Sequence, residues 1–226
     1  HLLSERTGSE KARLRALLGL WVHTWVAGRL GESLVHSRAL LEIAERTQDN
    51  ALRLQGHGGI GAVLMHMSDL DGARRHLDAG LALIGTAPPD TITLQNAAVT
   101  CAAYAAWVAA LRGDTRTMHA NIARSEDLGT ALSNPFASAI HLSLCANVHM
   151  AVGEPDPCRS LAARAVELSR AQRYPFWLGT GLVLQGWAEG RTGDPLRGLD
   201  LIDEGIAVFN ATGAGIQTAN WLGIRA

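Results

Sequence analysis

The feature that most constrains this sequence is a tight turn that recurs about every 40 residues. The turns lie at Gly28-Arg29, Ser68-Asp69, Gly113-Asp114, Gly153-Glu154 and Gly193-Asp194, with spacings of 40, 45, 40 and 40 residues. The one long interval contains the segment GTAPPDT (85–91), and its paired prolines predict an inserted loop. A fixed period of this length is typical of repeat arrays, in which each unit buries its apolar face against the next.

Small residues lie in register on both sides of each turn. The positions seven residues before, five after and twelve after the turn hold, in order, Trp21, Gly61, Ala106, Ala146 and Gly186; Ser33, Ala73, Met118, Cys158 and Gly198; and Leu40, Gly80, Ser125, Ala165 and Gly205. Mostly small residues at such offsets predict that the helix before the turn packs closely on the helix after it. We therefore expect the substitution Gly186→Leu to be strongly destabilising.

Each unit is predicted to be a helix, a turn and a second helix. The first helices are expected over about 10–27, 50–67, 91–112, 134–152 and 174–192, and the second over 31–47, 70–84, 114–131, 156–171 and 195–211. The segments SNPF (133–136) and RYPF (173–176) place proline at a helix start, and Asp49 and Asp90 are candidate N-caps. Because no segment alternates β-branched with polar residues, the fold class is predicted to be all-α.

The pattern resembles the tetratricopeptide repeat (TPR), with a small residue at repeat position 8, Gly-Asp at positions 15 and 16, and Ala at positions 20 and 27. The repeats exceed the standard unit of about 34 residues by about six. Repeats of this length are similar to the C-terminal arrays of bacterial predicted ATPases fused to adenylate cyclase domains, and of MalT-like regulators with a LuxR-type DNA-binding domain. The resemblance implies one domain (1–226), a right-handed solenoid of five TPR-like repeats (10–49, 50–90, 91–133, 134–173 and 174–214) and a partial sixth (215–226).

Composition and charge exclude several classes of protein. The apolar fraction of 47% excludes a disordered chain, and 20 basic against 21 acidic residues argue against nucleic acid as a partner. No run of 18 uncharged apolar residues predicts a membrane span, and three cysteines are typical of a reducing compartment. Arginine far outnumbers the single lysine, Lys11, which favours a G+C-rich bacterial genome. We expect a cytoplasmic fragment of a longer bacterial protein.

Candidate catalytic motifs in the sequence lack the context that their chemistry requires. The segment GHGGIG (56–61) fits a dinucleotide fingerprint, but it lies inside a predicted helix with no strand before it. No two of the nine histidines are four residues apart, so none forms a ligand pair on one helix. The cysteines (Cys101, Cys145 and Cys158) take small, buried repeat positions. We predict no catalytic residue, metal or cofactor, and expect any ATPase or cyclase domain to lie outside these residues.

The TPR resemblance implies that repeat positions 2, 5, 9, 12 and 13 face a concave groove. The candidate partner-binding residues at positions 9, 12 and 13 are Trp25, Met65, His66, Trp107, Asn147, Met150, Trp187 and Arg191. A groove rich in Trp and Met suits a partner helix or an apolar peptide. The expected function is a protein-interaction or scaffold module in signalling or transcription regulation; the alternative is a sensor for a small hydrophobic inducer or signal peptide. A tighter superhelix would instead bury these side chains as core.

The C-terminal segment predicts a surface for self-association. A further helix is expected from about residue 215, with apolar Ile216, Trp221, Leu222 and Ile224. Beside it, the second helix of repeat five presents Leu199, Ile202 and Ile206. In a repeat array such apolar faces are covered by the next unit, and uncovered ones drive association. We therefore expect a homodimer formed through the C-terminal end.

Overall fold

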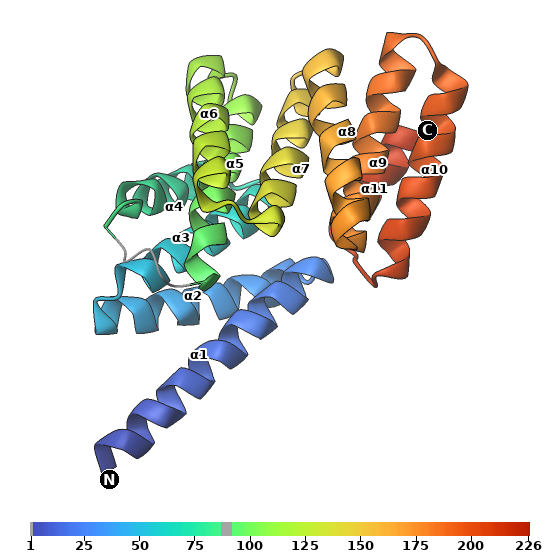
Figure 1. Ribbon diagram of the computed structural model, residues 1–226. Coiled ribbons are helices and arrows are strands. Elements are labelled where there is room, and N and C mark those ends of the chain that lie inside the picture. The colour runs from blue at the N-terminus through green and yellow to red at the C-terminus, as the bar shows by residue number, and fades with distance from the viewer. Residues whose placement is uncertain (1, 87–91) are drawn as a thin grey trace.

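The structure, a computed structural model, describes residues 2–86 and 92–226, with side chains described over 13–86 and 97–226. Every regular element in this part of the chain is a helix (Figure 1). The helices are α1 (Leu2–Val26), α2 (Leu30–Thr47), α3 (Asn50–His66), α4 (Leu70–Leu83), α5 (Ile92–Leu111), α6 (Thr115–Leu132), α7 (Pro135–Ala151), α8 (Pro155–Gln172), α9 (Pro175–Thr192), α10 (Pro195–Ala211) and α11 (Thr218–Arg225). The predicted Pro88-Pro89 loop and the Asp90 cap lie outside the described residues. The all-α prediction is confirmed for the described chain.

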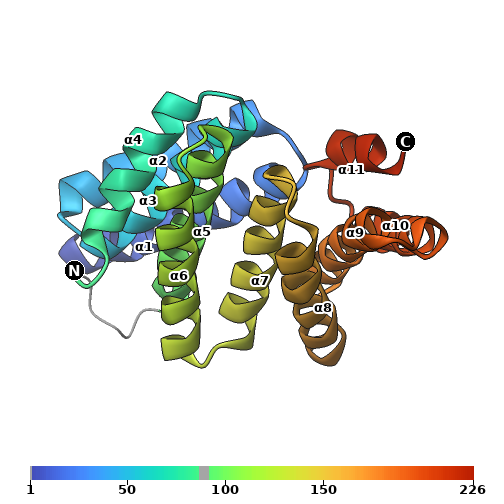
Figure 2. The same ribbon diagram turned by 90° about the horizontal axis from the view of Figure 1, so that it is seen from above.

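The helices pack as five consecutive pairs, α1/α2, α3/α4, α5/α6, α7/α8 and α9/α10. Helices α3, α5, α7 and α9 also pack against one another in order, so the pairs stack into a repeat solenoid (Figures 1 and 2). The solenoid prediction is confirmed. Helix α1 begins at Leu2, earlier than the expected residue 10, and α11 begins at Thr218.

Local chemistry explains where the helices begin. The side chain of Asp49 accepts hydrogen bonds from the backbone N–H groups of Ala51 and Leu52, which confirms the predicted cap. Pro135 and Pro175 take the first helical positions, as predicted. All five predicted turns contain a residue with positive φ, which is 65° at Ser68 and 75° to 129° at the glycines of the other four.

The small residues in register lie at the contact between the two helices of a pair, as predicted. A Cβ atom at Gly61 would lie 2.5 Å from Cγ of Leu77 in α4, and one at Gly186 would lie 2.5 Å from the carbonyl oxygen of Gly198 in α10. The side chain of Met118, five residues after a turn, is fully buried. These distances leave no room for a side chain at either glycine.

The glycines of the GHGGIG segment allow α3 to be packed on four sides. A Cβ atom at Gly56 would lie 2.9 Å from Leu41 in α2, and one at Gly59 would lie 3.0 Å from Trp21 in α1. Gly58 faces α5, and Gly61 faces α4. The segment therefore serves helix packing, as expected for Gly56 and Gly58.

The solenoid closes on itself through the segment before α11. The carbonyl oxygen of Val26, at the end of α1, accepts hydrogen bonds from the N–H groups of Gly215 (2.8 Å) and Ile216 (3.1 Å). Ile216 packs in one apolar cluster with Trp25 and Val26. Figure 2 shows this segment beside the turn between α1 and α2. Repeat one and the chain beyond repeat five are therefore neighbours.

Helix α11 covers part of the predicted C-terminal apolar face. Trp221 is buried and makes an edge-to-face contact with Phe209 of α10, with ring centroids 6.1 Å apart. Leu199 and Leu222 remain exposed. Within the described residues, no helix is long and apolar enough to cross a membrane.

Candidate ligand-binding cavity

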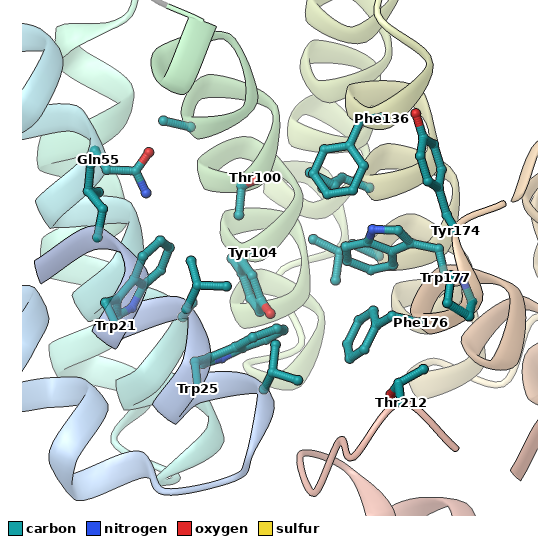
Figure 3. A pocket seen from close by; sticks show the side chains of 18 of the residues that line it. Trp21, Trp25, Gln55, Thr100, Tyr104, Phe136, Tyr174, Phe176, Trp177 and Thr212 are labelled. Carbon is teal, nitrogen blue, oxygen red and sulfur yellow. The ribbon is translucent and has the colours of Figure 1, made fainter. Parts of the chain in front are cut away.

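The concave side of the solenoid holds an apolar cavity of about 500 Å³ (Figure 3). All five first helices (α1, α3, α5, α7 and α9) contribute to its walls. The lining residues are Leu18, Trp21, Val22, Trp25, Val26, Gln55, Ala62, Ala97, Thr100, Tyr104, Phe136, Ile140, Leu144, Arg173, Tyr174, Pro175, Phe176, Trp177 and Thr212. A volume of this size lies within the range of small-molecule sites, about 300 to 1,000 Å³.

Seven aromatic side chains line the cavity, and they come from two opposite parts of the array (Figure 3). Trp21 and Trp25 lie one turn apart on α1. Phe136 follows the proline that begins α7, and Phe176 and Trp177 follow the proline that begins α9. Because proline fixes the start of each helix, it also fixes the direction in which these rings project.

Ring contacts join the aromatic groups to one another. Phe136 meets Tyr174 edge-on at 5.2 Å between ring centroids, and Phe176 meets Trp177 in the same way at 4.8 Å. Trp25 lies 6.1 Å from Phe176. This last contact links the first helix of repeat one to the first helix of repeat five, so closure of the solenoid also closes the cavity wall.

Several polar groups on the wall lack a hydrogen-bond partner within the described structure. Tyr104 is 2% exposed, its hydroxyl is unpaired, and burial raises the pKa of this phenol above its usual value. The indole Nε1 atoms of Trp21 and Trp25 are also buried and unpaired. By contrast, the Thr212 hydroxyl donates to the carbonyl oxygen of Phe209.

Gln55 is the one side-chain amide in the described lining of the cavity. It is 8% exposed, and no described residue hydrogen-bonds its side chain. In Figure 3 the amide projects from α3 into the cavity, toward the side on which Thr100 of α5 lies. Arg173 is the one charged residue in the described lining, and it is exposed.

Trp25 lines this cavity as expected, but the other seven predicted groove residues do not. Trp107 and Met65 are buried in the core, and Trp107 stacks on Tyr104 with ring centroids 6.1 Å apart. His66 contacts the edges of Trp25, Tyr104 and Trp107, and burial lowers its pKa to about 4. The expectation that Trp107 and Met65 share a cavity with Trp25 is therefore wrong.

The remaining predicted residues lie further along the same helices. Asn147 is fully buried and donates from Nδ2 to the carbonyl oxygen of Ser143 at 3.0 Å. Met150 and Trp187 are half-buried against the C-terminal core cluster, and Arg191 is exposed. The shared cavity expected for Met150 and Trp187 is likewise wrong. Positions 9, 12 and 13 therefore do not share one environment: Trp25 lines the cavity, Trp107 lies in the core and Arg191 is exposed. Whether these residues contact a partner stays a prediction.

The aromatic residues at the helix starts were not among the residues predicted for the groove. Phe136, Tyr174, Phe176 and Trp177 all precede repeat position 1, within the extra length that separates these repeats from the standard unit. The available signal was the repeated motif of proline followed by phenylalanine, in NPF (134–136) and YPF (174–176). Other lining residues, Gln55, Thr100 and Ile140, occupy position 2, which the TPR resemblance had placed in the groove.

The titratable groups elsewhere in the described structure offer little chemistry. Burial raises the pKa of each cysteine thiol to about 12, and a thiol of this kind is a poor nucleophile. His57 and His76 face each other with their Nδ1 atoms 3.0 Å apart. Within the described residues, no group of three or more His, Cys, Asp or Glu side chains could hold a metal ion.

Comparison with known proteins defines the fold of the chain. No protein-family model matches the sequence, and no curated protein is significantly similar to it. The structure is similar to a solved structure described as a Rap protein complexed with competence and sporulation factor, with a TM-score of 0.72 and 10% sequence identity. The match covers 89% of this chain and 54% of the Rap chain, so this chain corresponds to about half of that protein. The chain therefore has a TPR-like helical repeat fold.

Proposed function

We propose that the chain is a non-catalytic binding module that holds the apolar part of a partner segment in its aromatic cavity. The observation that carries this proposal is the cavity wall, to which seven aromatic side chains contribute. Aromatic anchors in desolvated pockets supply much of the binding energy at protein interfaces. The similar Rap protein is described in complex with a competence and sporulation factor. This description supports the proposal that the present chain also binds a partner.

The module would belong to a cytoplasmic bacterial signalling or transcription-regulatory protein. Its role there would be regulatory, because a ligand that binds one conformation of the solenoid shifts the population toward that conformation. Catalytic or DNA-binding domains of such a protein would lie outside these residues. The composition and the likeness to long-repeat bacterial arrays support this setting.

A small hydrophobic inducer is the second candidate, and the apolar lining of the cavity favours it. An extended peptide brings one donor and one acceptor per residue, and each costs free energy if it is buried without a partner. Polar atoms form only a small part of the described wall. They belong to Gln55, Thr100, Arg173 and Thr212, to the hydroxyls of Tyr104 and Tyr174, and to the indoles of Trp21, Trp25 and Trp177. What enters the cavity is therefore one or two apolar side chains of a peptide, or a compact hydrophobic molecule.

The test uses the uncharged fluorescent probe N-phenyl-1-naphthylamine and the capped peptide acetyl-Leu-Phe-Leu-amide. We expect the probe to bind the native protein with increased fluorescence and the peptide to displace it. Thr100→Phe fills the cavity from α5 and should abolish probe binding. Thr115→Phe makes the same change at an exposed position on α6 and should leave binding unchanged.

Thermal denaturation provides an independent readout of the same binding. A probe present at about a hundred times its Kd should stabilise the native protein by about 2.7 kcal/mol, with no gain for Thr100→Phe. Equal probe binding by the native protein and Thr100→Phe would contradict the proposal. Displacement of the probe by the peptide supports a partner segment, and its absence favours a small inducer.

A further inference from the structure

Gln55 gives the cavity a chemical preference that its apolar walls do not provide. The residue is more than nine-tenths buried on α3, and its amide points into the cavity (Figure 3). Neither amide atom has a hydrogen-bond partner within the described structure. An amide that points into an apolar cavity and has no protein partner offers its oxygen and its N–H groups to a ligand there.

The surroundings of Gln55 select against charge. Trp21 and Thr100 lie on the same side of the cavity (Figure 3), and Arg173, the one charged residue of the described lining, is exposed. His66, which lies behind Trp25 and Tyr104, is neutral near pH 7. An ionised group that enters this deep would lose its hydration without gaining a counter-charge, which is costly.

The geometry of a glutamine amide determines which polar group matches it. The side chain presents one acceptor oxygen and two N–H donors in one plane. A ligand amide, whether primary, secondary or cyclic, offers a complementary acceptor and donor at the same spacing. An ether or an ester offers acceptors only and leaves the Gln55 oxygen unpaired.

We propose that the cavity takes an uncharged, mostly apolar molecule or side-chain group that presents an amide to Gln55, with Gln55 as the specificity-determining residue. This inference rests on the proposed binding function and adds the chemical class of the ligand. The apolar body packs against the aromatic wall that includes Trp25 and Phe176, and the cavity volume of about 500 Å³ limits its size.

The test is a series of compounds that share one apolar body: butylbenzene, 4-butylbenzamide, methyl 4-butylbenzoate and 4-butylbenzoate. Affinity is measured by displacement of N-phenyl-1-naphthylamine from the native protein. The amide should bind about tenfold more tightly than butylbenzene, since each hydrogen bond contributes about 0.5 to 1.5 kcal/mol. The ester should gain less, and the benzoate anion should bind more weakly than butylbenzene.

The substitution Gln55→Leu should remove the amide preference, so that butylbenzene binds at least as tightly as 4-butylbenzamide. Gln172→Leu, at an exposed position on α8, should keep the preference. Equal affinities for the four compounds in the native protein, or an amide preference that survives Gln55→Leu, would overturn the inference while the proposed binding function stands. If neither the probe nor any of the four compounds binds, both proposals fail.

Discussion

Individual glycines determine how closely neighbouring helices approach. In α9, Gly186 and Gly190 lie one turn apart, but only Gly186 faces a close backbone atom at its Cβ position, the Gly198 oxygen at 2.5 Å. A Cβ at Gly190 would meet nothing within 4 Å. Glycine at position 186 therefore allows close helix packing, whereas glycine at position 190 only lowers the stability of the helix.

This difference predicts opposite effects of one substitution. Gly186→Leu should lower the free energy of unfolding by about 1 to 3 kcal/mol or more, because the leucine forces α9 and α10 apart. Gly190→Leu should raise it by up to about 1 kcal/mol, since leucine favours the helix. Urea denaturation of the two variants measures both changes. A Gly186→Leu protein as stable as the native one would show that the helix register is wrong.

At the scale of the element, first and second helices of each pair have different surroundings. Helix α3 packs against α2, α4 and α5, and Trp21 of α1 reaches it as well, so it carries apolar or small residues on most sides. Helix α10 instead packs on α9 and makes a smaller contact with α11, which leaves Leu196 and Leu199 exposed at 77% and 41%. Leu222 of α11 is exposed as well, so the C-terminal end of the array presents uncovered apolar side chains.

We expect these side chains to mediate self-association. The double substitution Leu199→Ser and Leu222→Ser should shift the protein toward the monomer, because less apolar area is then buried between copies. Leu20→Ser with Val35→Ser changes two exposed apolar residues at the other end of the array and serves as the control. Sedimentation velocity at several concentrations measures the effect. If the double substitution Leu199→Ser and Leu222→Ser leaves the distribution of monomer and oligomer unchanged, these residues do not form the interface.

At the scale of the whole molecule, the closure of the solenoid brings the two ends of the cavity wall together. The hydrogen bonds from Gly215 and Ile216 to Val26 hold the end of α1 against the segment before α11. Trp25 is thereby kept beside Phe176, and the cavity is closed on that side. The site therefore depends on a contact between residues about 190 positions apart in the chain.

Gly215→Val should open this closure. A Cβ at residue 215 would lie 2.5 Å from the carbonyl oxygen of Ala27, so the two segments must separate. We expect faster hydrogen exchange of the Ile216 amide, a loss of about 1 to 3 kcal/mol of stability, and weaker binding of N-phenyl-1-naphthylamine. Gly223→Val provides the control, because nothing lies within 4 Å of its Cβ position. Unchanged exchange at Ile216 would contradict the closure.

The sequence alone determined the helices, their order and the contacts within each pair. Turn residues, N-caps and helix-starting prolines act over a few residues, and the small residues at Gly61 and Gly186 recur at a fixed distance from each turn. All of these signals depend on local geometry, which the repeat period preserves. They therefore predicted the all-α solenoid without knowledge of its curvature.

Only the tertiary structure decided which inward-facing residues line a cavity and which form the core. The curvature of a solenoid is the sum of small rotations between successive repeats, and each rotation depends on the packing of side chains from both units. That sum brings Val26 to Gly215, buries Trp107 and Met65, and leaves space around Gln55 and the aromatic helix starts. A periodic pattern lists the side chains that face inward, but the distance across the array follows from packing that no single repeat contains.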